Sequence, residues 1–456
     1  MITLHHIGVV GKVIIVRFRC PPRQNGDGVI GRRNLSPRGL SEDIGTSRHG
    51  GLLVKDGVDF DFVGVKWVSS ISHEKDLGRA LTELRRDVRA RLGAPADLLI
   101  LFLTPHYEAD YERVPEAVAG ILSPALFVGC TGTGIIGNAR EIEDRPSVSV
   151  IVASLPGVDI TPFYVTEPDL PTLDAGPDQW YRALDVDPGE TPHFLLFVDP
   201  TGEVPFDPRP LLMGLDFAYP DSAKIGGLAS VLRENCMFMG DQLLSGGCAG
   251  IALQGNIGVD TVVAQGCRPV GSPMTITDCD GYLLSGLDDR PAVEVLVELY
   301  HTLIEQDQEL LQRSLHLGIA STGLKADYGA GDFLIRNVLQ LNHEKGTIAI
   351  GDHLERGQTV QFHLRDPESA HDELDLLLRR YRDGTEAEAA GALLFTCTGR
   401  GKHLFGEAHH DSGLFQSIVG EVPLAGMFCG GEIGPVGDST YLHGYTSSFA
   451  IFHPLD

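Results

Sequence analysis

Residues 423–437 read PLAGMFCGGEIGPVG, a short apolar run followed by four glycines, one carboxylate and one proline. Short apolar runs that end at Gly or Pro are typical of strands buried on both faces. Glycine adopts backbone angles closed to other residues and lets a ligand or a second strand approach the main chain. The stretch therefore predicts a buried strand and then a glycine loop, which is either a structural corner or a binding surface.

The same pattern recurs along the chain. One copy has LLILFLTP (98–105), PALFVGCTGTGIIG from Pro124 and SVSVIVASLPG from Ser147. Another has ALLFTCTG (392–399), the stretch from Pro423 and TSSFAIF from Thr446, and a fainter middle copy has HFLLFVDP (193–200), PDSAKIGGLAS and GCAGIALQGN. A proline precedes Cys130 and Cys429 by six positions, so we align these cysteines, and Thr133 then takes the place of Glu432. Such repetition indicates one supersecondary unit used several times.

Helical signals separate these runs. Helices are predicted at 76–93, at 291–316 with Asp288 or Asp289 as N-cap, and at 366–384. Residues 332–352 predict two strands joined by a turn, and 358–365 predict another strand. We expect a mixed α/β, sheet-rich fold of weakly repeated strand–glycine-loop–strand units. Helices pack on the sheets, and the units form two related halves, 78–290 and 291–456.

Charge and composition exclude several classes of partner. The 62 acidic and 36 basic residues give a formal charge of -26, which repels nucleic acid and anionic lipid. No run approaches the roughly 20 apolar residues of a membrane span, so no membrane association is expected. The eight cysteines show no CxxC spacing and follow no secretory signal, which favours free thiols in the cytoplasm.

The first 55 residues differ from the rest. They hold nine Lys and Arg against three Asp and Glu, and they are rich in Gly, Pro, Arg and Ser without apolar periodicity. This composition predicts a disordered extension or upstream sequence translated from too early a start codon. A basic tail for some partner is the alternative.

Several stretches resemble the FIST domain proteins, which have FIST_N and FIST_C halves. In the C-terminal half these are FLIRNVLQLNHEKGTIAIGD, GQTVQFHLRD, ALLFTCTGRG, PLAGMFCGGEIGPVG and YLHGYTSSFAIF; in the N-terminal half they are DLLILFLTPH, GCTGTGIIG and VSVIVASLPG. The resemblance covers residues 78–456. It implies a bacterial sensory, signal-transduction module that binds a small ligand such as an amino acid or organic acid. No fused output domain or F-box is recognisable, so a separate signalling output protein is the implied partner.

Glycine loops at matching strand ends are expected to line a common cleft, because ligands of α/β sheets bind outside strand ends. Arg336 and Arg365 lie within apolar strands, and each either holds a ligand carboxylate or pairs internally with Asp366, Asp332 or Glu432. In the ligand-binding interpretation, Glu432, Thr398 and loop N–H groups bind the ligand's amine and polar atoms. The expected ligand-binding set is Cys130, Gly132, Thr133, Arg336, Arg365, Thr398, Arg400, Cys429, Gly430, Gly431, Glu432, Gly434 and His443.

The sequence also contains residues of types that serve other chemistries. Cys130 or Cys429 at a glycine-rich turn could act as the nucleophile of a thiol-dependent acyl transferase or hydrolase, although a buried cysteine usually only packs. GCTGTGIIG lacks both phosphate-loop patterns, GxxxxGK[ST] and GxGxxG with a following helix. His409-His410-Asp411 is the only cluster of metal-ligand residue types, and adjacent side chains point apart. We therefore expect no cofactor and no metal.

Overall fold

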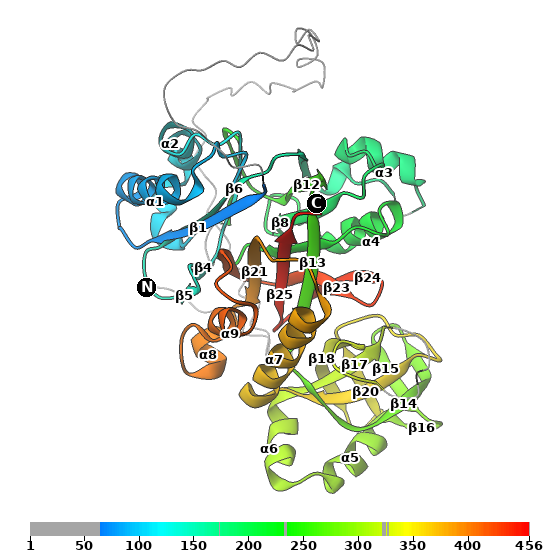
Figure 1. The fold of residues 1–456 in the computed structure, drawn as a ribbon. Helices are drawn as coiled ribbons and strands as arrows, with labels where there is room; N and C mark the ends of the chain where they lie inside the picture. The colour runs from blue at the N-terminus through cyan, green and yellow to red at the C-terminus, as the bar shows by residue number, and fades with distance from the viewer. Residues whose placement is uncertain (1–63, 173, 232–234, 322–324, 326–327, 456) are drawn as a thin grey trace, which may run out of the picture. The chain divides into compact units, whose positions relative to one another are not determined.

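The computed structural model describes residues 64–172, 174–231, 235–321, 325 and 328–455. The expectations for residues 1–55 therefore lie outside the described residues. Helices pack on sheets in the described part of the chain, which confirms the mixed α/β, sheet-rich class (Figure 1). None of the helices described is both long enough and apolar enough to cross a lipid bilayer.

The described part of the chain is built from three equivalent units and one inserted segment. The first unit comprises β1 (Lys66–Ser72), α1 (Leu77–Leu92), β2 (Leu98–Leu103), the 3-10 helix η1 (Pro105–Arg113), α2 (Val114–Ile121), β3 (Leu126–Thr131), β4 (Ile135–Gly137), β5 (Arg140–Ile142) and β6 (Val148–Ser154). The second comprises β7 (Val158–Val165), the 3-10 helix η2 (Glu167–Asp169), α3 (Pro177–Leu184), β8 (His193–Asp199), α4 (Pro208–Ala218), β9 (Lys224–Leu228), β10 (Met237–Met239), β11 (Gln242–Leu244) and β12 (Gly247–Gly255).

The third unit is interrupted by the inserted segment. It comprises β13 (Gly258–Ala264), α7 (Pro367–Gly384), β21 (Gly391–Cys397), α8 (Gly401–Phe405), α9 (His410–Val419), β22 (Leu424–Cys429), β23 (Glu432–Val436), β24 (Ser439–His443) and β25 (Ser447–His453). The inserted segment comprises β14 (Arg268–Asp280), β15 (Leu283–Leu287), β16 (Arg290–Pro291), α5 (Ala292–Thr302), α6 (Glu305–Ser314), β17 (Leu315–Ala320), β18 (Phe333–Asn342), β19 (Thr347–Ile350) and β20 (Thr359–Leu364). The expected boundary at 290–291 falls within this segment.

Each unit forms a six-stranded sheet that is completed by a hairpin from another unit. The strand orders are β1-β6-β2-β3-β10-β11, β7-β12-β8-β9-β23-β24 and β13-β25-β21-β22-β4-β5. Figure 1 shows β25, in red, beside β13 and β21 of its own sheet. Hairpin β4–β5 of the first unit joins the third sheet, where β4 pairs with β22. Hairpin β10–β11 of the second unit joins the first sheet beside β3, and hairpin β23–β24 of the third unit joins the second sheet beside β9. Each unit therefore gives a hairpin to one of the other two units and receives one from the other.

The three centre strands, β2, β8 and β21, meet in the core through equivalent phenylalanines. The ring centroids of Phe102, Phe197 and Phe395 lie 6.0, 6.2 and 6.1 Å from one another. All three side chains are fully buried. Aromatic pairs at such spacing add stability beyond their buried area, so this triad joins the three sheets.

A glycine recurs where the neighbouring parallel strand approaches most closely. Gly129, Gly226 and Gly426 pair with the leucines that precede the three phenylalanines. A Cβ on these glycines would lie 2.7, 1.9 and 1.8 Å from the carbonyl oxygen of the paired leucine. No larger residue fits there without moving a strand, which explains the glycine in each strand.

These registers correct the alignment made from sequence. With Gly129 placed on Gly426, Cys130 aligns with Met427, and Glu432 aligns with Ile135. The sequence alignment of Cys130 with Cys429, and of Thr133 with Glu432, was therefore wrong by two positions. The error arose because the packing fixes the position of the glycine and not that of the cysteine.

The helix predictions hold at two places and fail at one. Helices α1 and α7 begin after Asp76 and Asp366, whose side chains accept N–H groups of the first turn. The single helix expected over 291–316 is two helices, α5 and α6, because Leu303 and Ile304 are extended. Neither Asp288 nor Asp289 is the N-cap of α5, because both turn the chain with a positive φ and the N-cap position belongs to Pro291.

Candidate functional site

The candidate site lies where β21 ends. Cys397 ends this centre strand, and the equivalent positions in the other units are Thr104 and Asp199. The carboxylate of Asp199 accepts the N–H of Gly246 at 2.7 Å, and the N–H of Thr104 donates to the carbonyl of Ser147 at 3.1 Å. At the third end the N–H of Cys397 likewise donates to the carbonyl of Thr446 at 3.0 Å, so a difference between the three ends lies in the surrounding side chains.

The third strand end differs. Three buried polar atoms near it have no hydrogen-bond partner in the described part of the chain: Nε of Arg365, Oε1 of Glu432 and Nδ1 of His443. Glu432 and His443 are paired across β23 and β24, so their side chains share one face of the hairpin. Buried polar atoms are nearly always paired in native proteins, so three unpaired atoms in one place call for an explanation.

Glu432 is a completely buried carboxyl group. Its Oε2 accepts the N–H of Thr446 at 3.0 Å. Burial raises the pKa of Glu432 to about 8, although that hydrogen bond and the charges of Arg400 and Arg365 act in the opposite direction. The carboxyl group therefore holds a proton at neutral pH until a cation or donor arrives beside it.

Arg365 follows β20 and carries a guanidinium without an ion partner. Its Cζ lies 4.4 Å from the ring centroid of Tyr445, and Nη2 donates to the carbonyl of Gly399 at 3.4 Å. Asp366 pairs with Arg268, and Asp332 pairs with Lys325. Burial and then the charge of Arg400 lower the pKa of Arg365. Among the described residues no carboxylate pairs with Arg365, so its guanidinium is available to an anion.

The other two predicted arginines are engaged by the protein. Arg336 pairs with Asp352 at 2.5 Å and donates to the carbonyl of Leu442 at 3.1 Å. Arg400 is fully buried and binds both oxygens of Asp411 at 2.8 Å, through Nε and Nη2. Burial would raise the pKa of Asp411, but Arg400 outweighs it and holds that pKa well below its ordinary value. Arg400 is therefore a structural residue.

A cavity of about 310 Å³ has His443 in its wall, while Arg365 and Glu432 lie outside its lining. Its walls include His316, Arg336, His443 and Tyr445. Nε2 of His443 donates to the carbonyl of Gly434 at 3.0 Å, and burial lowers the pKa of His443 to about 4. The ring is thus neutral with Nδ1 as a free acceptor. Tyr445 lines the cavity and also contacts Arg365, which connects the open space to the buried guanidinium.

The predicted glycine loop is shorter than expected, because β23 begins at Glu432. The N–H of Gly430 donates to Leu228 at 3.0 Å, and the carbonyl of Gly431 accepts from the same residue at 2.8 Å. Gly434 lies inside β23, where a Cβ would stand 2.6 Å from Oγ of Ser448. This stretch thus forms a corner that joins β22 to β23 and pairs with β9.

The remaining predicted residues lie away from the cavity. The N–H of Gly132 donates to Leu103 at 3.1 Å, and the N–H of Thr133 donates to Oγ of Ser230 at 2.9 Å. Thr398 is exposed, and its N–H donates to the carbonyl of Cys429 at 3.1 Å. These contacts hold strands and units together and leave few of these N–H groups for a ligand.

Cys130 and Cys429 lie together in the core that the three sheets share. Both are completely buried, and burial raises the pKa of each thiol well above its ordinary value. A nucleophilic cysteine needs a lowered pKa and access to substrate. The cysteines in the described ranges are free thiols, and these two have the surroundings of packed core residues.

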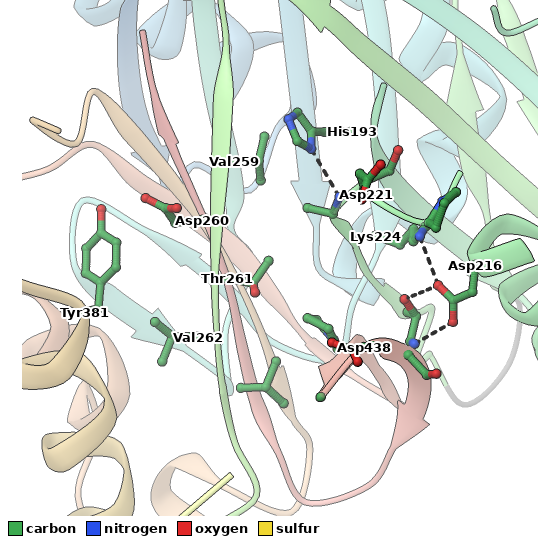
Figure 2. Close-up of a pocket in the computed structure, with 18 of the residues that line it drawn as sticks. His193, Asp216, Asp221, Lys224, Val259, Asp260, Thr261, Val262, Tyr381 and Asp438 are labelled. Carbon is green, nitrogen blue, oxygen red and sulfur yellow. Dashed lines mark hydrogen bonds and ion pairs between the residues drawn. The ribbon is translucent and has the colours of Figure 1, made fainter. Parts of the chain in front are cut away.

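Another cavity, of about 870 Å³, contains none of the predicted residues. Figure 2 shows its acidic walls, which include Asp216, Asp221, Asp260 and Asp438. Asp216 is engaged by the buried amine of Lys224 at 3.0 Å and by the N–H of a residue in β24. No group of three or more His, Cys, Asp or Glu within the described ranges is placed to hold a metal ion.

Comparison with known proteins gives the family. Residues 97–290 match the FIST N domain, and residues 292–435 match the FIST C domain. The chain belongs to the FIST family. FIST domains form a family of sensory domains. An uncharacterized FIST relative from Mycobacterium tuberculosis is 34% identical over 389 residues, covering 84% of this chain and 98% of its own. A second uncharacterized relative, from Mycobacterium bovis, is 34% identical over 381 residues, covering 83% of this chain and 96% of its own.

A solved structure of a cyanuric acid hydrolase from A. caulinodans aligns with 85% of this FIST protein and 99% of its own chain. It has 8% sequence identity and a TM-score of 0.31. A similarity of this size carries no information about activity.

Sequence reasoning about this FIST protein missed Cys397 and Tyr445. Cys397 could have been found from the repeat, because Asp199 occupies the equivalent position and marks it as a polar strand end. Tyr445 has a φ of 66°, which a non-glycine residue rarely adopts, and nothing in GYTSS signals it. The sequence cannot show this backbone angle.

Proposed function

We propose that this FIST protein binds a small organic molecule beside Cys397, in the 310 Å³ cavity and against Arg365, Glu432 and His443. The observation that carries the proposal is the gathering of three unpaired buried polar atoms at one of three equivalent strand ends. Leaving a buried polar group unpaired costs about 1–3 kcal/mol, and a ligand that pairs it recovers this free energy.

The groups available define the ligand's chemistry. The planar guanidinium of Arg365 suits a carboxylate, which can bind its nitrogens in a forked pair. Nδ1 of His443 is an acceptor, and Oε1 of Glu432 becomes one when the carboxyl group gives up its proton to pair with a cation, so the two suit an amine. We therefore infer an amino acid, or a small organic acid that uses the arginine alone. The cavity volume lies at the small end of ligand sites and favours a compact molecule.

The position of the cavity supports a sensory role, which we propose that the protein performs in the cytoplasm. Its walls come from the inserted segment, through His316 and Arg336, and from hairpin β23–β24, through His443. A ligand that contacts both parts stabilises one arrangement of them, and a separate output protein could bind that arrangement.

The test is a calorimetric and thermal-shift screen of amino acids and small organic acids against the full chain. A ligand that binds only the folded state raises the melting temperature by mass action. Arg365→Met should abolish the shift, whereas Arg356→Met should preserve it, because Arg356 is an exposed arginine paired with Asp278. A ligand that binds both variants equally would show that the site lies elsewhere.

A further inference from the structure

A second cavity, of about 590 Å³, lies between α7 and the inserted sheet. It shares Gln265, Cys267 and Ile335 with the 310 Å³ cavity, and its other walls differ. Gln265 lies in the wall that both cavities share and binds two residues of β18. Its side-chain nitrogen donates to the carbonyl of Phe333 at 2.5 Å, and its side-chain oxygen accepts the N–H of Ile335 at 2.8 Å. The larger cavity is therefore a separate space with its own chemistry.

Its walls are mainly apolar and aromatic. The rings of Tyr328 and Phe333 lie 4.9 Å apart, and the imidazole of His363 lies 5.2 Å from Phe333. Ile304 and Leu376 form part of its rim and are 66% and 40% exposed. Such exposure of large apolar side chains around an aromatic cavity is typical of a binding site for an apolar group.

The imidazole of His363 brings one hydrogen-bond acceptor to the wall of this cavity. His363 is 4% exposed, and its Nδ1 donates to the carbonyl of Gln361 at 3.0 Å. That bond fixes the tautomer and leaves Nε2 as an acceptor, for which the described residues supply no donor. Burial lowers the pKa of His363 to about 4, so the ring stays neutral at physiological pH. The occupant must therefore bring a hydrogen-bond donor.

The charge of the lining is negative. Arg268 is the one cation among the lining residues in the described ranges, and it is paired with Asp307 and Asp366. Glu368 and Asp372 line the rim and have no ion-pair partner among the described residues. Carboxylates around an aromatic wall favour a cation, both through charge and through contact with the ring faces.

We propose that this cavity is a second binding site, for an organic cation that has an apolar body and a protonated amine. The amine donates to Nε2 of His363 while the body packs between Phe333 and the rim residues Ile304 and Leu376. The unpaired rim carboxylates exclude anions of the same shape. The proposal does not depend on the function assigned to the 310 Å³ cavity.

The experiment compares three probes of equal size on the full chain by calorimetry: phenethylammonium, 2-phenylethanol and phenylacetate. We expect phenethylammonium to bind at least tenfold more tightly than phenylacetate, with the neutral alcohol between them. Leu376→Lys places a like charge at the exposed rim and should weaken phenethylammonium binding at least tenfold. Leu339→Lys is the matched control, because Leu339 is 47% exposed and does not line the cavity.

Two further results would decide against the site. Absence of phenethylammonium binding, or equal binding of phenylacetate, would overturn the proposed cation selectivity. Equal affinities of Leu376→Lys and Leu339→Lys would place the binding outside this cavity. Arg365→Met should change phenethylammonium affinity less than twofold, which separates this site from the one beside Cys397.

Discussion

The guanidinium of Arg365 lies over the ring of Tyr445, with 4.4 Å between Cζ and the ring centroid, and no carboxylate in the described part of the chain pairs with it. Arg400, a neighbour in the same region, is held by both oxygens of Asp411. The fully buried Arg400 and the partly buried Arg365 thus have opposite electrostatic surroundings. We conclude that Arg400 serves stability and Arg365 serves binding.

This contrast predicts opposite effects of the same substitution. Arg400→Met leaves Asp411 as an uncompensated buried charge and should destabilise the protein by about 3–5 kcal/mol. Arg365→Met removes a partly buried charge that has no ion partner, so the free energy of unfolding should stay the same or rise. Urea denaturation of both variants measures the difference. Equal losses would mean that Arg365 has a structural partner after all.

Glu432→Gln should change how stability depends on pH. The pKa of Glu432 is raised from 4.5 to about 8 in the folded state. Its contribution to stability is therefore complete below pH 4.5 and is lost as the pH rises toward 8, by about 1.4 kcal/mol per pH unit at most. Glutamine does not ionise, so the variant should gain stability relative to the natural protein between pH 5 and 8. A constant difference across this range would argue against a raised pKa.

The same variant should also weaken ligand binding. A hydrogen bond to a charged group contributes about 1.5–3 kcal/mol, so Glu432→Gln should reduce the affinity for an amine-bearing ligand by that amount. Titration calorimetry at pH 7 with a ligand from the screen measures this loss. Unaltered affinity would remove Glu432 from the binding site.

The core thiols should be unreactive in the native protein. Cys130 and Cys429 are completely buried with raised pKa values, so iodoacetamide should label them only after unfolding. Mass spectrometry of peptides from native and urea-treated protein gives the comparison. Rapid native labelling of either residue, with loss of a measured turnover, would restore the thiol-enzyme interpretation.

Two glycine-to-alanine changes test the strand packing. A Cβ at Gly426 would lie 1.8 Å from a backbone carbonyl oxygen, so Gly426→Ala should cost about 3 kcal/mol, the upper end for overpacking. Gly413 lies in α9 with open space around it, so Gly413→Ala should stabilise the protein by about 0.5–1 kcal/mol. Thermal unfolding of the pair is the measurement. Similar melting temperatures would contradict the strand register.

Local signals in the sequence were sufficient for much of the fold. The runs around Leu101, Leu196 and Leu394 predicted buried centre strands, and Asp-Pro at 366–367 marked the start of α7. Such signals depend on neighbouring residues only. The exchange of hairpins depends on pairings such as Glu432 with Gly227, which lie far apart along the chain and leave no local trace.

The candidate site was predicted in part. Arg336 and Arg365 were selected because arginines within apolar strands need partners, and Glu432 was selected because it follows the glycine loop. Arg365 and Glu432 retain unpaired atoms, as does His443, whereas Arg336 pairs with Asp352 and Arg400 with Asp411. The two outcomes differ only in which carboxylate comes within reach, and that is a property of the tertiary structure.

The closed exchange of hairpins also constrains synthesis on the ribosome. Once Gly255 has emerged from the ribosome, the second sheet lacks only the hairpin β23–β24. Its strand β9 then stays unpaired on one side until β23, which starts at Glu432, has been synthesised. At typical elongation rates this edge stays open for roughly 10–35 s. Nascent chains therefore carry an unpaired β-strand edge that invites association with chaperones or with other chains. Hairpin β23–β24, which covers this edge, also carries Glu432 and His443, so the proposed ligand site cannot form before residue 443 has been synthesised.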